Sequence, residues 1–263
     1  MFSEQAFQTY VNTALAEPTL LNEAMKYSLL GGGKRIRPTL AQEAAKLASL
    51  SNGPSESCAF AIEIAHAFSL VHDDLPCMDN DDFRRGLPTS HRKFGEAQAL
   101  LAGDALLNFA NETFLECLAG VSPEAFFRSF RFFVGAIGSE GMILGQSEEL
   151  HFDDSNLENL IRIQKLKTGK LFQASLLCPI LLSGKLPSDP LYVSCEKYAD
   201  AFGFAFQIAD DLEDAAQDQI QNAKNILSHL GRSSAVKLAR EKLFSCEISD
   251  QFSVTSVLLS KLK

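Results

Sequence analysis

The sequence predicts an all-α protein, and three observations support this prediction. Apolar residues recur every three or four positions along most of the chain, which is the spacing of helices that bury one face. Valine, isoleucine and threonine are too few, and alternating apolar runs too rare, for a sheet-based fold. No linker-like stretch or internal repeat divides the chain. We therefore expect one domain, residues 1–263, folded as a helical bundle of about ten or more helices.

The clearest single helix is predicted over residues 55–75. It follows the start signal Asn52-Gly53-Pro54, and its apolar residues are spaced by three or four positions. The same spacing predicts further helices, in chain order, over 94–118, 124–144, 157–182, 189–214 and 233–244. Segments rich in glycine, proline or serine separate the helical stretches, at 31–33, 86–88, 120–123 and 183–190.

Composition narrows the class of protein. The chain has 263 residues, 46% of them hydrophobic, and a net charge of −9, which argues against a nucleic-acid partner because phosphate binding needs a basic face. The first 18 residues contain no lysine or arginine, so no secretory signal is expected and we predict a cytoplasmic protein. The most apolar segment, 171–182, is shorter than the ~20 residues of a membrane span, so no stable membrane insertion is expected. The six cysteines lack zinc-site spacing, and we expect them to be reduced.

The most unusual segment is HDDLPCMDNDDFRR, at 72–85. Five of the ten residues 73–82 are aspartates at the end of an apolar helix, and Arg84 and Arg85 follow them. Clustered carboxylates repel one another, so they must face water or share a cation. Oxygen ligands suit Mg²⁺, which completes its shell with water and substrate phosphates, and guanidinium groups match phosphate oxygens. Taken alone, the segment fits either a diphosphate site or a solvated acidic loop.

A second apolar helix, 203–214, also ends in carboxylates. Its polar residues lie at positions i, i+3, i+4 and i+7, so that one helical face presents an amide and three acids: Gln207, Asp210, Asp211 and Asp214. Two such helices facing each other would hold several Mg²⁺ ions around one diphosphate. The second helix therefore favours the metal site over the acidic loop.

Two basic segments add candidate phosphate ligands. GGGKRIRP, at 31–38, concentrates three cations where the glycines permit a tight backbone and Pro38 disfavours a helical Arg37. It lacks the GxxxxGK[ST] spacing of a nucleotide P-loop. KTGK, at 167–170, lies inside an apolar helical pattern, where a charged side chain needs a partner.

The chain resembles the short-chain trans-polyprenyl diphosphate synthases, the family of farnesyl and geranylgeranyl diphosphate synthases. Four motifs match in the right order: GGGKRIRP, HAFSLVHDDLPCMDNDDFRRGLPTSHRKFGEAQALLAGDALL, KTGKLFQAS and FQIADDLED. The resemblance extends from about Tyr27 to about Glu241. It implies an all-helical homodimer with a deep central cavity, across which the two aspartate-rich motifs face each other.

The resemblance also implies a reaction, the head-to-tail condensation of isopentenyl diphosphate with an allylic diphosphate. By resemblance, three Mg²⁺ ions, for which Mn²⁺ can substitute, grip the allylic diphosphate through Asp73, Asp74, Asp79, Asp210, Asp211 and Asp214. Residues matched around that diphosphate are Arg84, Lys167, Thr168 and Gln207. Those matched to isopentenyl diphosphate are Lys34, Arg37, His66 and Arg85. A direct part in catalysis is implied for Asp73, Asp79, Lys167, Thr168, Gln207 and Asp210. No side-chain base is implied, because the released diphosphate is thought to take the proton.

Product length gives two readings. In the family, the residues four and five positions before the first aspartate help to set the cavity floor. Here they are Ser69 and Phe68, about 6 and 7.5 Å along the helix axis from Asp73. Phe68 resembles the aromatic floor of bacterial farnesyl enzymes, whereas DDLPCMDNDD is typical of plant geranylgeranyl enzymes. We expect the C15 product, farnesyl diphosphate, with the C20 product, geranylgeranyl diphosphate, as the alternative.

Two departures from the family keep another alternative open. The loop that follows the second motif is compressed to 215–225; the first of its two usual lysines is missing, and Lys224 is the candidate for the second. The chain also ends early, at Lys263, relative to the usual C-terminal helical segment. A non-catalytic homologue that binds prenyl diphosphates or regulates a partner is therefore an alternative, although two intact aspartate motifs count against it.

Overall fold

The computed structural model describes residues 2–151, 156–221 and 225–262, and confirms the all-α prediction. Helices make up nearly all of the regular structure in these ranges. The strands within them form one antiparallel hairpin, β1 (Phe83–Arg84) and β2 (Leu87–Pro88). Among the described helices, none combines the length and the apolar character that crossing a membrane would take. The chain separates into two compact units, described here one at a time: Met1–Gln42 with Ser51–Gly120, and Glu43–Leu50 with Val121–Lys263.

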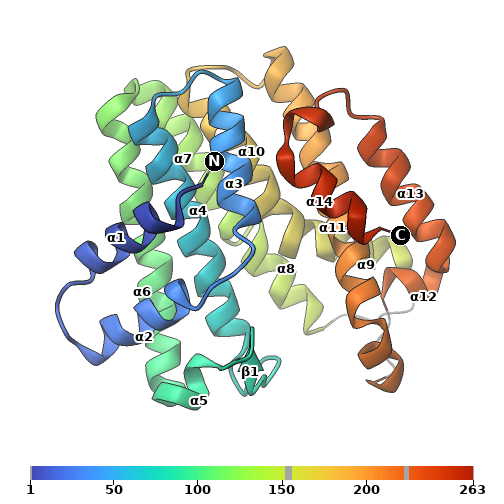
Figure 1. Cartoon of the computed structure of the whole chain (residues 1–263), viewed down its shortest axis with the longest axis horizontal. Coiled ribbons are helices and arrows are strands. Elements are labelled where there is room, and N and C mark those ends of the chain that lie inside the picture. Colours follow the sequence, from blue (N-terminus) through green and yellow to red (C-terminus); the bar gives the residue numbers. More distant parts are fainter. Residues whose placement is uncertain (1, 152–155, 222–224, 263) are drawn as a thin grey trace. The chain divides into compact units, whose positions relative to one another are not determined.

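The first unit is built around α4 (Asn52–Asp73), which packs along α6 (Glu96–Leu115) (Figure 1). The other helices of this unit are α1 (Glu4–Ala14), α2 (Leu20–Leu30), the beginning of α3 (Ile36–Leu47), α5 (Ser90–Phe94) and η1 (Glu116–Gly120). The predicted helix 55–75 is α4. The predicted helix 94–118 begins instead at Glu96, because Gly95 has a φ of +88° and ends α5.

The second unit is centred on α10 (Lys170–Leu182), which packs against α7 (Pro123–Ile137) and α11 (Pro190–Gln221) (Figure 1). Residues 171–182 are all buried, as expected of a helix that is apolar on every side. The remaining elements are α8 (Met142–Glu149), α9 (Leu157–Gln164), η2 (Lys165–Gly169), α12 (Ile226–Leu230), α13 (Arg232–Phe244), η3 (Ser249–Gln251) and α14 (Ser253–Lys261).

One predicted helix, 124–144, is wrong as a single element. The structure divides it between α7 and α8 at the segment 138–141, whose ends are both glycine. A side chain at Gly141 would overlap the carbonyl oxygen of Ala136, so the chain turns here only because this position has no Cβ. The N-terminal helices α1 to α3 and the C-terminal α14 were not predicted individually.

Close packing of α4 on α6 depends on a glycine. A Cβ at Gly103 would overlap the imidazole of His72, whose Nε2 lies 3.1 Å from the carbonyl oxygen of Leu100. We expect Gly103→Ala to lower the free energy of unfolding by about 1–3 kcal/mol, measured by chemical denaturation, because the two helices must move apart. Gly53→Ala is the matched control: nothing lies within 4 Å of its Cβ, so stability should be unchanged or rise by up to ~1 kcal/mol. Equal stability of the two variants would contradict this packing argument.

Candidate active site

The first aspartate motif lies where α4 ends. Asp73 is the last residue of that helix, and the chain then folds back so that the backbone N–H of Asp79 donates to the carbonyl oxygen of Asp73 at 2.9 Å. Asn80, with a φ of +53°, completes the turn and donates to Leu75. The fold-back places Asp79 next to Asp73, although the two residues are six positions apart in sequence. Asp73 is half-buried and Asp79 is exposed, so a cation can approach this pair from solvent.

Asp74 is different, because it is buried and ion-paired. Its Oδ1 accepts from Arg84 Nε at 2.6 Å, and Arg84 also reaches Asp81 at 3.2 Å. Burial raises the pKa of Asp74, and the adjacent Arg84 guanidinium opposes that rise. Two residues that the sequence assigns to one diphosphate therefore contact each other. A diphosphate that binds Arg84 would compete with Asp74 for the same guanidinium.

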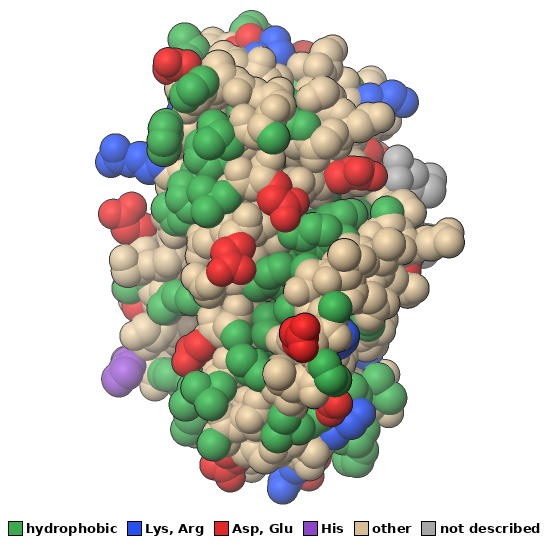
Figure 2. Space-filling view, turned by 90° about the vertical axis from the view of Figure 1, so that its left-hand side faces the viewer, with side chains coloured by type: hydrophobic (Ala, Val, Ile, Leu, Met, Phe, Trp, Pro, Cys, Tyr) green, Lys and Arg blue, Asp and Glu red, His purple; other side chains and the backbone are tan. Residues whose placement is uncertain are grey.

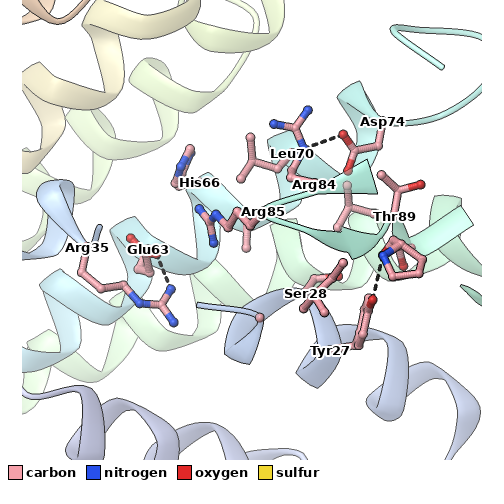
Figure 3. A pocket seen from close by; sticks show the side chains of 16 residues that line it. Tyr27, Ser28, Arg35, Glu63, His66, Leu70, Asp74, Arg84, Arg85 and Thr89 are labelled. Atoms are coloured by element: carbon pink, nitrogen blue, oxygen red, sulfur yellow. Dashed lines mark hydrogen bonds and ion pairs between the residues drawn. The ribbon is translucent and has the colours of Figure 1, made fainter. Parts of the chain in front are cut away.

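A pocket of the first unit lies between α4 and the hairpin (Figure 3). One face of α4 lines it with residues at helical spacing: Glu63, His66, Ala67, Leu70, Val71 and Asp74. The hairpin contributes Arg84 and Arg85, and the glycine-rich loop contributes Arg35. The pocket thus combines acidic side chains with a concentration of arginines.

The glycine-rich loop forms the basic side of this region. Gly32 and Gly33 have φ angles of +84° and +140°, and the Arg85 guanidinium covers them, donating to the carbonyl oxygen of Gly32. A Cβ at Gly33 would lie 2.8 Å from Arg85 Nη1, so a side chain at this position would displace the guanidinium. Arg37 Nη1 is 3.4 Å from His66 Nε2. The structure therefore brings Arg37, His66 and Arg85 together, and it places Lys34 on the exposed surface of the same loop.

The surroundings of His66 favour its neutral form. Burial lowers its pKa well below the ordinary value, and the positive charges of Arg37 and Arg85 lower it further. A neutral imidazole can accept the hydrogen bond that Arg37 is placed to donate. His66 therefore orients a neighbouring cation without adding a charge of its own.

The second aspartate motif lies on α11, in the second unit. Asp211 is 5% exposed, and both of its carboxylate oxygens are used: Oδ1 accepts from Gln207 Nε2 at 2.9 Å, and Oδ2 accepts from the backbone N–H of Ile226 at 3.1 Å. Asp210 is half-buried and Asp214 is exposed. The three acids share one helical face, as predicted, but Asp211 also holds the start of α12 in place.

Lys167 and Thr168 lie in η2, a π-helical turn between α9 and α10. Such turns are frequently found at functional sites. α8 packs directly on this turn. The approach is so close that a Cβ at Gly145 would overlap the backbone nitrogen of Lys167. Lys167 Nζ pairs with Glu149, which is the partner that a lysine in an apolar pattern requires.

The residues predicted to set product length pack inside the first unit. Phe68 is 3% exposed, with its ring edge-on to that of His72 at 6.2 Å between centroids. The Ser69 hydroxyl donates to the carbonyl oxygen of His66 at 2.9 Å. Neither residue lines the pocket of Figure 3. Lys224, the candidate loop lysine, lies outside the described residues.

The donor chemistry fits Mg²⁺. In the described parts of the chain, no three or more histidine, cysteine or carboxylate side chains gather closely enough to hold a metal on their own. Mg²⁺ needs no such cage, since it binds through one or two carboxylates and completes its shell with water and substrate phosphates. Asp73 with Asp79, and Asp210 with Asp214, are the candidate oxygen donors of the two motifs.

Two charged residues that line the pocket, Glu63 and its partner Arg35, were not among the site residues predicted from the sequence. Their side chains meet at 2.5 Å. Glu63 lies three positions before His66 in an apolar helix. A charged residue within an apolar helical pattern needs a partner, and this rule applies to Glu63 as it does to Lys167.

Comparison with known proteins places the chain in a family. Residues 18–234 match the family model described as polyprenyl synthetase. The chain belongs to the polyprenyl synthetase family. The match includes residues of both units.

Two plant relatives are similar to this polyprenyl synthetase over 90% of its length. The heterodimeric geranylgeranyl pyrophosphate synthase large subunit 1, chloroplastic, of Arabidopsis thaliana is 41% identical over 245 residues. The geranylgeranyl pyrophosphate synthase, chloroplastic, of Catharanthus roseus is 39% identical over 239 residues. The chain covers 65% and 66% of the length of these two relatives, respectively.

Solved structures of the same family are similar in fold. A farnesyl/geranylfarnesyl (FPP/GFPP) synthase from Zymomonas mobilis has a TM-score of 0.84 at 33% identity. A geranyltranstransferase from Thermotoga maritima has a TM-score of 0.81 at 31% identity. In both comparisons 98% of this chain and 95% of the other are covered. The all-helical fold expected from the resemblance is confirmed.

Proposed function

We propose that this polyprenyl synthetase is a Mg²⁺-dependent trans-prenyltransferase that condenses isopentenyl diphosphate with an allylic diphosphate. The observation that carries the proposal is one pocket in which an acid of the first aspartate motif lies with the arginines of the hairpin and the histidine of α4. Asp74 and Arg84 lie beside Arg85 and His66 there (Figure 3). Acidic groups suited to metal next to cations suited to phosphate are what two diphosphate substrates require.

The chemistry explains why these residue types are needed. Breaking the allylic C–O bond leaves a carbocation and a diphosphate, so catalysis depends on stabilising the leaving-group charge. Mg²⁺, when bound, would supply most of that stabilisation. Arg84 and Lys167 would bind the allylic diphosphate, while Lys34 and Arg37 would orient isopentenyl diphosphate for attack by its double bond. The cavity must exclude water, which would otherwise capture the cation.

We further propose that the product is C20 geranylgeranyl diphosphate, in place of the C15 product expected from Phe68. The plant relatives, at 41% and 39% identity, are named geranylgeranyl synthases. The bacterial structures, named an FPP/GFPP synthase and a geranyltranstransferase, are 33% and 31% identical. Phe68 is buried against His72, so its bulk is explained by packing without a role as a cavity floor.

Sizing the product tests this proposal. We would incubate purified protein with isopentenyl diphosphate, Mg²⁺ and either dimethylallyl or geranyl diphosphate, remove the phosphates and measure the chain length of the alcohols. A C20 alcohol is the expected result. A C15 alcohol would overturn the product assignment and favour the predicted role of Phe68 as the cavity floor that limits product length. No condensation by folded protein would favour the non-catalytic homologue.

The quaternary structure is also a proposal: we infer a homodimer formed through α6. Figure 2 faces the side on which α6 lies in Figure 1, and hydrophobic side chains gather there. The exposed leucines on α6 and the following turn, each between 43% and 54% exposed, are Leu100, Leu101, Leu115 and Leu118. A contiguous exposed apolar patch typically marks an interface, and Leu100 and Leu101 are adjacent in sequence on this helix.

Leu101→Glu is expected to convert dimers to monomers in analytical ultracentrifugation, because the charge would be buried without a partner. Leu20→Glu, at an equally exposed leucine of α2, is the matched control and should leave the dimer intact. A Leu101→Glu variant that stays dimeric would contradict this assignment.

The predicted cytoplasmic location stays a prediction, and both plant relatives carry chloroplastic names.

A further inference from the structure

The Arg35 guanidinium is fully engaged inside the first unit. Its Nη1 donates to Glu63 Oε1 at 2.5 Å, and its Nε and Nη2 donate to the two carboxylate oxygens of Glu4, each at 2.9 Å. Nη2 also donates to the carbonyl oxygen of Leu29 at 2.8 Å, and the group lies 5.2 Å from the ring centroid of Phe7. Arg35 is 9% exposed. It is therefore a structural cation, although it lies between two candidate diphosphate ligands in sequence.

Glu63 is the inner anchor of this guanidinium. It comes from α4, one turn before His66, and is 3% exposed (Figure 3). Burial raises its pKa, and the charges of Arg35, Arg37 and Arg85 oppose that rise. The two acids that line the described pocket are Glu63 and Asp74, and Asp74 pairs with Arg84. Glu63 thus joins the glycine-rich loop to the helix that carries the first aspartate motif.

The loop needs such an anchor because its backbone is strained. Arg35 has a φ of +46°, following positive φ angles at Gly32 and Gly33. A left-handed non-glycine residue costs about 1 kcal/mol or more and persists only where its surroundings hold it. This conformation turns Arg35 inward while Lys34 stays exposed on the loop. The ion pair with Glu63 holds this strained residue in place, and Arg35 lies between Lys34 and Arg37 in sequence.

We propose that Glu63 is a positioning residue for isopentenyl diphosphate binding, acting through Arg35 on Lys34 and Arg37. The inference rests on the proposed function of the loop. Glu63→Gln keeps the side-chain shape and an acceptor oxygen but removes the charge that holds Arg35. We expect affinity for isopentenyl diphosphate to fall about tenfold, equivalent to roughly 1.4 kcal/mol. KM for the allylic substrate and kcat at saturating isopentenyl diphosphate should change by less than about twofold, because Glu63 would not touch the reacting atoms.

The affinity for isopentenyl diphosphate is expected to change in the opposite direction if Glu63 acts only through its negative charge on the electrostatic potential of the pocket. Removing an anion from a basic pocket would then make the pocket more attractive to diphosphate, and the affinity would rise. The direction of the change thus separates positioning from simple electrostatics. A double variant, Arg35→Gln with Glu63→Gln, should lose no more affinity than the worse single variant if the effect passes through Arg35.

The test is calorimetric titration of isopentenyl diphosphate into the whole protein in EDTA, so that metal-dependent binding does not contribute. Lys34→Ala shows the loss of a direct ligand, and Glu56→Gln, on an exposed position of α4, is the matched control that should bind as the wild type does. Thermal unfolding of each variant checks that the fold is retained.

Unchanged or tighter binding by folded Glu63→Gln would overturn the inference. If that variant fails to fold, Glu4→Gln replaces it, since Glu4 is the half-exposed partner of the same guanidinium. A loss of about threefold is then expected, and no loss would overturn the inference. A wild-type protein that binds no isopentenyl diphosphate would instead contradict the proposed function of the loop itself, and with it the basis of this inference.

Discussion

Asp73→Asn is expected to lower the rate of prenyl transfer about a thousandfold while leaving the fold intact. The substitution is nearly isosteric, and the hydrogen bond that closes the motif uses the backbone oxygen of Asp73, which the variant retains. What is lost is an oxygen charge suited to Mg²⁺, beside Asp79. Steady-state turnover with a fluorescent or radiolabelled allylic substrate measures the effect, and circular dichroism checks the fold.

The control for this substitution is Asp82→Asn, in the same acidic segment. Asp82 is exposed and paired with Arg92 at the surface, where an ion pair contributes little. Its turnover should stay within about twofold of the wild-type value. Comparable losses in both variants would mean that the general acidity of the segment matters and that no particular carboxylate of the motif binds the metal.

Asp211→Ala is expected to lower stability and activity together. Both carboxylate oxygens of this buried residue accept hydrogen bonds, from Gln207 and from the backbone of Ile226. Their loss leaves two donors without acceptors, at a cost of about 2–4 kcal/mol in the free energy of unfolding. Urea denaturation measures this change, and turnover should fall as well, because α12 loses its attachment to α11.

Asp214→Ala provides the comparison on the same helical face. Asp214 is exposed, so stability should change by less than about 0.5 kcal/mol even if turnover falls sharply. The pair thus separates a buried acid whose contacts support the helix from an exposed acid of the same motif. Equal stability of the two variants would show that the Asp211 contacts contribute nothing to the fold.

The sequence was most informative in long helices with a strong apolar periodicity. For this reason α4 and α11 could be predicted, together with the face shared by Gln207, Asp210 and Asp214, although α11 continues to Gln221, past the predicted end at Asp214. The short N-terminal helices could not, because helices of this length depend on tertiary packing more than on their own propensity. The π-helical turn at Lys167 could not be predicted either, because apolar residues spaced by three or four positions do not distinguish one π-helical turn from the α-helix around it.

Motifs could be found from the sequence, but partners distant in sequence could not. Nothing in the spacing shows that Arg84 pairs with Asp74, or that Glu4 and Glu63 share the guanidinium of Arg35 across 31 and 28 positions. Family resemblance assigned all three acids of the second motif to metal binding, whereas burial singles out Asp211. Such differences arise from tertiary contacts. Residues of the same type in one motif look alike in the sequence, whatever their contacts in the folded protein.

The most direct test of the account is a condensation assay with the purified chain, run in parallel with Mg²⁺ and with EDTA. We would measure incorporation of labelled isopentenyl diphosphate into a longer prenyl chain. The account predicts incorporation with Mg²⁺, none in EDTA, and little in Asp73→Asn. A folded wild-type protein that binds isopentenyl diphosphate but forms no longer chain in Mg²⁺ would contradict it.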